Sequence, residues 1–113
     1  MTEYEIARTS EEEARVYTMV KSLRNPQYRL IKPISVRIEW ADPGFLVYDE
    51  EDFTYGTGDS IDEALEDYRG SLIAEFEVLC RDRAILAEVL QRELRILETY
   101  VERNCCDTRR NLL

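Results

Sequence analysis

The feature that most constrains this chain is a single apolar stripe along the segment from Ser60 to Arg81. Its members recur with the helical period of about 3.6 residues, at Ile61, Ala64, Leu65, Tyr68, Leu72, Phe76, Leu79 and Cys80. Ser60 and Glu63 have the spacing of a capping box, in which both side chains accept backbone N–H groups at a helix start. A helix with one apolar face has to bury it, so the rest of the chain must supply a matching surface.

Two further features concern this helix and the segment after it. Gly70 lies inside it, where glycine costs about 1 kcal/mol relative to alanine, so we expect close packing to explain its presence. After the break at Arg81–Asp82–Arg83, a last helix is predicted over about Ala84–Arg103. Its apolar side chains are expected to cover the sheet or to pack on the first long helix; they are Leu86, Val89, Leu90, Leu94, Leu97 and Val101.

The matching surface comes from three short segments with strand signals. Apolar and polar residues alternate over Ile34–Trp40, the period of a half-buried strand. The turn sequence Asp42–Pro43–Gly44 and a second strand, Phe45–Tyr48, complete a hairpin. Phe53–Tyr55 is a third strand, closed by Gly56–Thr57–Gly58. We predict an α+β fold with a small three-stranded antiparallel sheet covered by the long helix, because only one face of such strands is apolar.

The segment before the hairpin fits two structures. Ser10 and Glu13 have capping-box spacing, and the apolar residues from Val16 to Leu23 recur at helical intervals. The run Val16–Val20 also has high strand propensity. We favour a helix over Ser10–Leu23, ended by Asn25–Pro26.

The negative charge of the chain is concentrated in one block. The net charge is −9, from 15 Lys and Arg and 24 Asp and Glu. Eleven acidic residues and no Lys or Arg lie between Ile38 and Tyr68. This block is either a solvated face that maintains solubility or a surface that attracts a basic partner protein. Direct nucleic-acid binding is not expected, because phosphate contacts require clustered Lys and Arg.

The residue types present exclude most catalytic sites. The chain has no histidine, which excludes Ser–His and Cys–His catalysis and histidine-ligated metals. The acids of the run Asp49–Asp52 point in different directions, and Asp59, Asp62 and Glu63 already serve a helix start. Gly56–Thr57–Gly58 is followed by an acid rather than a lysine, so it predicts a turn and not a phosphate loop. We expect no enzymatic activity, no metal and no cofactor.

Two observations bear on the compartment. No apolar run approaches the roughly 18 residues of a membrane-spanning helix, and Met1–Ser10 lacks the apolar stretch of a signal peptide, so we expect a cytoplasmic protein without membrane contact. Cys80, Cys105 and Cys106 form no CxxC pair and no metal-binding spacing. Cys80 is expected in the core, and reduced thiols fit all three positions. A regulatory pair at Cys105 and Cys106 stays open.

One stretch carries a family resemblance. A strand ends near Trp40, a Pro–Gly turn leads to Phe45–Tyr48, and a glycine precedes the run Gly58–Asp59–Ser60–Ile61–Asp62–Glu63–Ala64–Leu65–Glu66. This arrangement, over Pro33–Leu79, resembles the HicB-like antitoxin family, in which a helix starting G-D-(T/S)-x-x-E-A-(L/I) follows a hairpin and a third strand. The match covers about 47 of the 113 residues. The resemblance implies a small module, similar to a truncated RNase H-like sheet, that neutralises a small basic RNA-cleaving toxin and self-associates.

The chain departs from that family at two places. Asp49–Tyr55 replaces the usual P-x-L-P-G-C segment, and the single predicted helix over 84–103 does not make the DNA-binding domain that many such antitoxins carry. The alternative is a self-assembling structural or adaptor protein of the same fold without a toxin. A gene neighbour encoding a small basic protein would favour the antitoxin interpretation.

The sequence therefore predicts one domain, 1–113, with a HicB-like core over about 28–81 and a C-terminal helix over about 84–103. Acids complement a basic partner, and aromatic residues anchor interfaces. The expected partner-binding residues are Tyr48, Asp49, Glu50, Glu51, Asp52 and Tyr55. Ser60 and Glu63 are expected to cap the long helix.

Overall fold

The computed structural model describes residues 4–7 and 15–104, with side chains from residue 17 onward. The elements follow in the order β1 (Tyr4–Ala7), β2 (Arg15–Val20), β3 (Tyr28–Leu30), β4 (Ile34–Trp40), β5 (Phe45–Asp49), β6 (Tyr55–Gly58), α1 (Ile61–Arg81), the 3₁₀ turn η1 (Arg83–Ile85), α2 (Glu88–Leu97) and β7 (Val101–Arg103).

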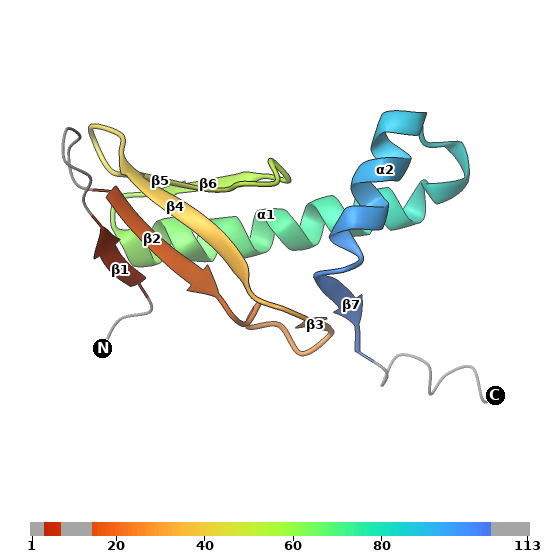
Figure 1. Ribbon diagram of the computed structural model, residues 1–113, viewed down its shortest axis with the longest axis horizontal. Helices are drawn as coiled ribbons and strands as arrows, with labels where there is room; N and C mark the ends of the chain where they lie inside the picture. The colour runs from red at the N-terminus through yellow and green to blue at the C-terminus, as the bar shows by residue number, and fades with distance from the viewer. Residues whose placement is uncertain (1–3, 8–14, 105–113) are drawn as a thin grey trace.

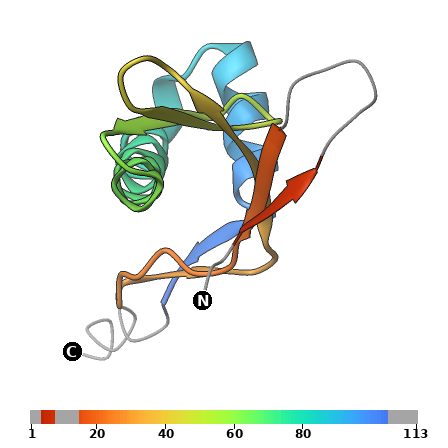
Figure 2. The same ribbon diagram turned by 90° about the vertical axis from the view of Figure 1, so that its left-hand side faces the viewer.

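The fold is α+β, as the sequence predicts, but its main sheet is larger than expected. Five antiparallel strands lie in the order β1-β2-β4-β5-β6, and β3 and β7 form a second, two-stranded sheet (Figure 1). Helix α1 packs along β5 and β6. Viewed along α1, the sheet curves from β6 above the helix to β2 and β1 at its side (Figure 2).

The core lies between the inner face of the sheet and α1. Ile34, Val36 and Ile38 of β4 are buried, which confirms the alternation that predicted this strand. They join the buried stripe of α1, which includes Leu65, Leu72 and Phe76. The predicted turn is also confirmed, since Gly44 has φ +91° between β4 and β5. The apolar face of the strands and the apolar stripe of the helix therefore pack against each other in one core.

The helix favoured for Ser10–Leu23 is wrong over the described part of that segment. Arg15–Val20 forms β2, and residues 10–14 lie outside the described residues. Its side chains alternate, with Thr18 and Val20 buried and Met19 exposed. Pairing with β4, from Val16↔Ile38 to Val20↔Ile34, outweighs the local helical spacing. Strand propensity in such a segment is realised only when a partner strand is present.

The third strand of the hairpin unit is shifted from its predicted position. Gly56–Thr57–Gly58 lies within β6 rather than in a closing turn, and Phe53 is a buried side chain in the connection before it. An added Cβ at Gly56 would lie 2.3 Å from the backbone nitrogen of Tyr68, and one at Gly58 would lie 2.5 Å from that of Ala64. These glycines therefore allow β6 to lie directly on α1.

Gly70 differs from Gly56 and Gly58. It is exposed in the middle of α1, and an added Cβ would meet no atom within 4 Å. The expectation that close packing explains Gly70 is wrong, and nothing in the structure accounts for a glycine at this position.

The predicted C-terminal helix is divided by the structure. Only Glu88–Leu97 is α-helical, and Val101 lies in β7, paired with Leu30. The amides of Thr99 and Tyr100 bond to carbonyls three residues back, which tightens and ends the helix. Leu94 and Leu97 are buried in the common core and Cys80 packs against it, whereas Val89 is exposed. The helix thus packs partly on α1, and the tail from Cys105 lies outside the described residues.

The capping box at the start of α1 is confirmed, with one change of partner. Ser60 Oγ accepts the amide of Glu63 at 3.1 Å, and Glu63 Oε1 accepts the amide of Asp59, rather than that of Ser60, at 2.9 Å. Ser60→Ala is therefore expected to lower the free energy of unfolding by about 1 kcal/mol, because the Glu63 amide loses its acceptor. Urea denaturation measures this change. Ser71→Ala, inside the same helix, is the control and should not destabilise; superimposable curves for Ser60→Ala and the unmodified protein would contradict the cap.

Candidate interaction surface

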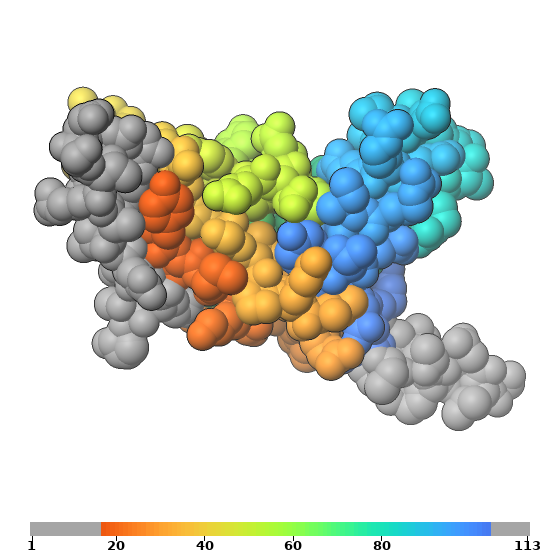
Figure 3. All heavy atoms as spheres, viewed as in Figure 1, coloured from red at the N-terminus to blue at the C-terminus, as the bar shows by residue number. Residues whose placement is uncertain are grey.

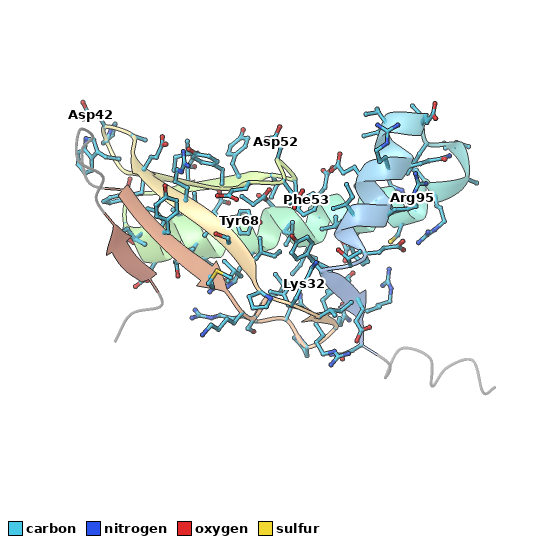
Figure 4. The ribbon with its side chains drawn as sticks, in the orientation of Figure 1. Lys32, Asp42, Asp52, Phe53, Tyr68 and Arg95 are labelled. Carbon is cyan, nitrogen blue, oxygen red and sulfur yellow. The ribbon has the colours of Figure 1, made fainter. Side chains whose placement is uncertain are left out.

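Five of the six expected partner-binding residues lie together at one end of the β5–β6 hairpin. Tyr48 and Tyr55 are directly paired across the two strands. They point away from α1, because side chains alternate along a strand and the neighbouring Val47 and Gly56 are buried. The exposed turn Glu50–Asp52 connects the strands, with Asp52 at the tip (Figure 4). We call this set the hairpin surface.

Asp49 is the exception, because it belongs to the inward-facing half of β5. Its side chain is only 2% exposed. Its Oδ1 accepts the amide of Phe53 at 2.9 Å, and its Oδ2 accepts the amide of Thr54 at 3.4 Å and the Tyr68 hydroxyl at 2.7 Å. Tyr68 lies between the sheet and α1 (Figure 4), where burial, followed by the charge of Asp49 and the hydrogen bond to it, raises the pKa of the phenol. Asp49 therefore fixes the conformation of the turn from the buried side of the sheet.

The outer face of the sheet carries a row of side chains that sequence reasoning missed. Tyr17, Arg37, Tyr48 and Tyr55 are successive cross-strand partners on β2, β4, β5 and β6. The Arg37 guanidinium lies 5.3 Å from the ring centroid of Tyr17 and 5.8 Å from that of Tyr48. Arg37 was recognisable as an outward position of β4, but Tyr17 joins the row only because residues 15–20 form a strand. We call these four residues the tyrosine row.

Hydrogen bonds fix the centre of the tyrosine row. Arg37 Nη1 donates to the Tyr48 hydroxyl at 3.2 Å, and that hydroxyl donates to Glu39 Oε2 at 2.6 Å. Burial and the hydrogen bond to Glu39 raise the pKa of Tyr48, while the bond to Tyr48 raises the pKa of Arg37. At neutral pH Tyr48 is therefore protonated and Arg37 is charged, with Glu39 as the neighbouring counter-charge.

The turn of the hairpin surface has little positive charge beside it. Among residues 17–104, no Lys or Arg nitrogen lies within 4.0 Å of the carboxylates of Glu50, Glu51 or Asp52. Glu51 accepts a hydrogen bond from the Tyr100 hydroxyl at 3.2 Å, and Lys32 lies 4.4 Å from the centre of the Tyr100 ring. The hairpin end and α2 form two separate projections on one side of the molecule (Figure 3). The negative charge of Glu50 and Asp52 thus faces solvent.

Two acidic side chains, Glu93 of α2 and Glu75 of α1, lie close together where the two helices meet. Burial raises the pKa of Glu93 to about 7, and a hydrogen bond to Glu75 and the charges of Glu75, Asp49 and Asp52 act in the same direction. A carboxyl group whose pKa is higher in the folded state than in the unfolded chain stabilises the fold most at pH values below its pKa in the unfolded chain. This contribution decreases as the pH rises from about 4.5 to about 7.

Glu93→Gln is therefore expected to raise the free energy of unfolding by about 1–2 kcal/mol at pH 8, because the amide carries no charge to desolvate. At pH 4.5 the same substitution should change stability little. Urea denaturation at both pH values measures the difference, with Glu50→Gln, in the exposed turn, as the control. An equal effect of Glu93→Gln at both pH values would contradict the raised pKa.

Comparison of the chain with protein-family models, with curated proteins and with solved structures gave no match. In the part of the chain that the structure describes, no three His, Cys, Asp or Glu side chains are grouped so as to hold a metal ion. Within the same residues, no helix has the length and apolar character needed to cross a membrane.

Proposed function

We propose that this chain is a non-catalytic, HicB-like antitoxin-type module that binds a small basic partner protein through the hairpin surface. The observation that carries the proposal is the meeting of an exposed acidic turn with two outward-facing tyrosines at one hairpin end. Tyrosine supplies a large contact area at interfaces, and neighbouring charge selects the sign of the partner. The module would act in the cytoplasm, without a cofactor and without direct contact to nucleic acid.

The geometry supports different roles for different residues of the hairpin surface. Glu50 and Asp52 face solvent, so they act at a distance and raise the rate of encounter with a positively charged protein. Tyr48 and Tyr55 lie beside them on two paired strands, and the hydrogen bonds of Tyr48 to Arg37 and Glu39 already hold its ring, so ordering that ring on binding costs little additional entropy. Asp49 takes no part in contact and positions the turn through Phe53 and Tyr68.

The test begins with affinity purification of this chain from native cells, where we expect a small basic protein to co-purify. That protein, produced separately, is then the binding partner in the assay. Association should slow markedly between about 10 mM and about 100 mM salt, as the Debye length falls from about 30 Å to about 10 Å. Biolayer interferometry measures the association rate constant. The triple variant Glu50→Gln, Glu51→Gln, Asp52→Asn should slow it further and leave the thermal melt unchanged.

A charge-matched control separates the hairpin surface from net charge alone. Asp42→Asn, Asp59→Asn and Glu88→Gln remove the same charge away from the turn, and Figure 4 places Asp42 at the opposite end of the hairpin from Asp52. This control should leave the association rate close to that of the unmodified chain. Equal slowing by both triple variants, or a rate indifferent to salt, would leave only the solubility role for the acidic block.

The second candidate function is a self-assembling structural or adaptor protein. It is favoured by large apolar side chains that remain exposed near α2, with Ile85 81% and Val89 63% exposed. Exposed apolar patches mark association sites when they are contiguous. Sedimentation velocity at increasing concentration distinguishes the candidates: a mass that rises with concentration and returns to that of the single chain in Val89→Asp supports self-assembly.

A further inference from the structure

We propose that Tyr55 is the docking position for an arginine side chain of the basic partner, which stacks on the end of the tyrosine row as Arg37 stacks within it. This inference rests on the proposed function and specifies the chemistry of the partner. The residue that the partner contributes is an arginine and not a lysine, and its contact site is the single ring of Tyr55 and not the acidic block as a whole.

The chain itself shows how this face holds a guanidinium group. Arg37 lies between the rings of Tyr17 and Tyr48, at 5.3 Å and 5.8 Å from their centroids, and donates to the Tyr48 hydroxyl. Ring faces attract cations, and the planar guanidinium group also stacks on them. On the edge strand β6, Tyr55 offers one such ring, so an arginine side chain there would stack on a single ring instead of between two.

Tyr55 differs from the other tyrosines of residues 17–104 in having no side-chain partner there. Tyr17 and Tyr48 share Arg37, Tyr28 lies 5.5 Å from the Arg103 guanidinium, and Tyr100 lies 4.4 Å from Lys32. Tyr68 is buried and bonded to Asp49. The side chain of Tyr55 has no ring, cation or hydrogen-bond partner among those residues, and it is 63% exposed. An incoming side chain therefore reaches its ring without displacing a contact among the described residues.

Charge around Tyr55 fits a cation. Glu50 and Asp52 of the adjoining turn are exposed carboxylates, which accept the forked N–H groups of arginine in pairs. The backbone of Arg37 is two strands away, about 10 Å at the usual strand spacing, and its guanidinium group is engaged by the hydroxyl of Tyr48 on the intervening strand. Glu39, linked to Arg37 through Tyr48, offsets its charge. A second guanidinium group on Tyr55 therefore meets little repulsion.

The test compares two capped peptides of equal charge and length, one of alternating arginine and glycine and one of alternating lysine and glycine. Isothermal titration calorimetry at low salt measures both dissociation constants. The arginine peptide should bind the unmodified chain about twofold more tightly, because both cations are attracted to a ring face but only the planar guanidinium group also stacks on it. Tyr55→Ala should abolish this preference, whereas Tyr55→Phe, which keeps the ring, should retain it.

Thr57→Ala is the matched control, since Thr57 is the next outward position on β6 and has no ring. It should bind both peptides as the unmodified chain does. The ring proton shifts of Tyr55, followed by NMR during titration, should move with the arginine peptide, and this readout does not depend on the stability of any variant.

The outcomes separate this inference from the proposed function. If both peptides bind equally well, or if the arginine preference survives in Tyr55→Ala, the stacking position is wrong while an acidic surface for a basic partner stands. If neither peptide binds the unmodified chain, the proposed function and this inference both fall.

Discussion

Replacing Gly56 with alanine is expected to lower the free energy of unfolding by about 3 kcal/mol, near the upper end of the cost of overpacking a core. The added Cβ would lie 2.3 Å from the backbone nitrogen of Tyr68 and 2.6 Å from the carbonyl oxygen of Ala64. Both are backbone atoms of α1, so no side-chain rotation relieves the clash. Strand β6 would have to separate from the helix on which it packs.

The control for this substitution is the same chemical change elsewhere in the chain. At Gly70 the added Cβ meets nothing within 4 Å, and alanine is the better helix former. Gly70→Ala should therefore raise the free energy of unfolding by about 0.5–1 kcal/mol. Urea denaturation of the two variants should give shifts of opposite sign. A Gly56→Ala protein as stable as the unmodified chain would show that β6 does not lie against α1 as described.

Replacing Asp49 with alanine is expected to cost about 3 kcal/mol. The substitution leaves the buried Tyr68 hydroxyl and the Phe53 amide without their acceptor, and each buried donor left unpaired costs about 1–3 kcal/mol. The neighbouring Glu50 is exposed, so Glu50→Gln should change stability by less than about 0.5 kcal/mol. Two adjacent acids of one run thus have effects that differ severalfold.

A double-mutant cycle identifies the hydrogen bond as the cause. Tyr68→Phe removes the hydroxyl and should cost about 1 kcal/mol alone. Combined with Asp49→Ala it should cost less than the sum of the single changes, because the unpaired hydroxyl is then absent. Chemical denaturation of the four proteins measures the coupling. Strict additivity, or an Asp49→Ala protein of unchanged stability, would contradict the role of Asp49 as the anchor of the turn.

The alternation of β5 predicts a buried position for Asp49, whereas the charge of the side chain predicts an exposed one. Phe45, Val47 and Asp49 occupy the same half of the strand period, and the structure turns all three toward α1. Charge predicts exposure for most acids, but a carboxylate supplied with three donors is stable in the interior. Two of these donors, the amides of Phe53 and Thr54, are close in the chain, but sequence alone does not reveal the third, because Tyr68 is nineteen residues away.

Sequence by itself determined the elements whose signals are local. The Ser60–Glu63 cap and the apolar period of α1, the alternation of β4 and the Asp42–Gly44 turn depend on residues close in the chain, so they were predicted correctly. Tertiary structure alone decided β2 and β7, because the local signals of these segments predicted helix and each forms a strand only by pairing: β2 pairs with β1 and β4, and β7 pairs with β3. It also decided the tyrosine row. The consecutive hairpin strands β4, β5 and β6 align Arg37, Tyr48 and Tyr55, but Tyr17 joins them only through the pairing of β2 with β4, and no local pattern encodes the register between these two strands, which β3 separates in the chain.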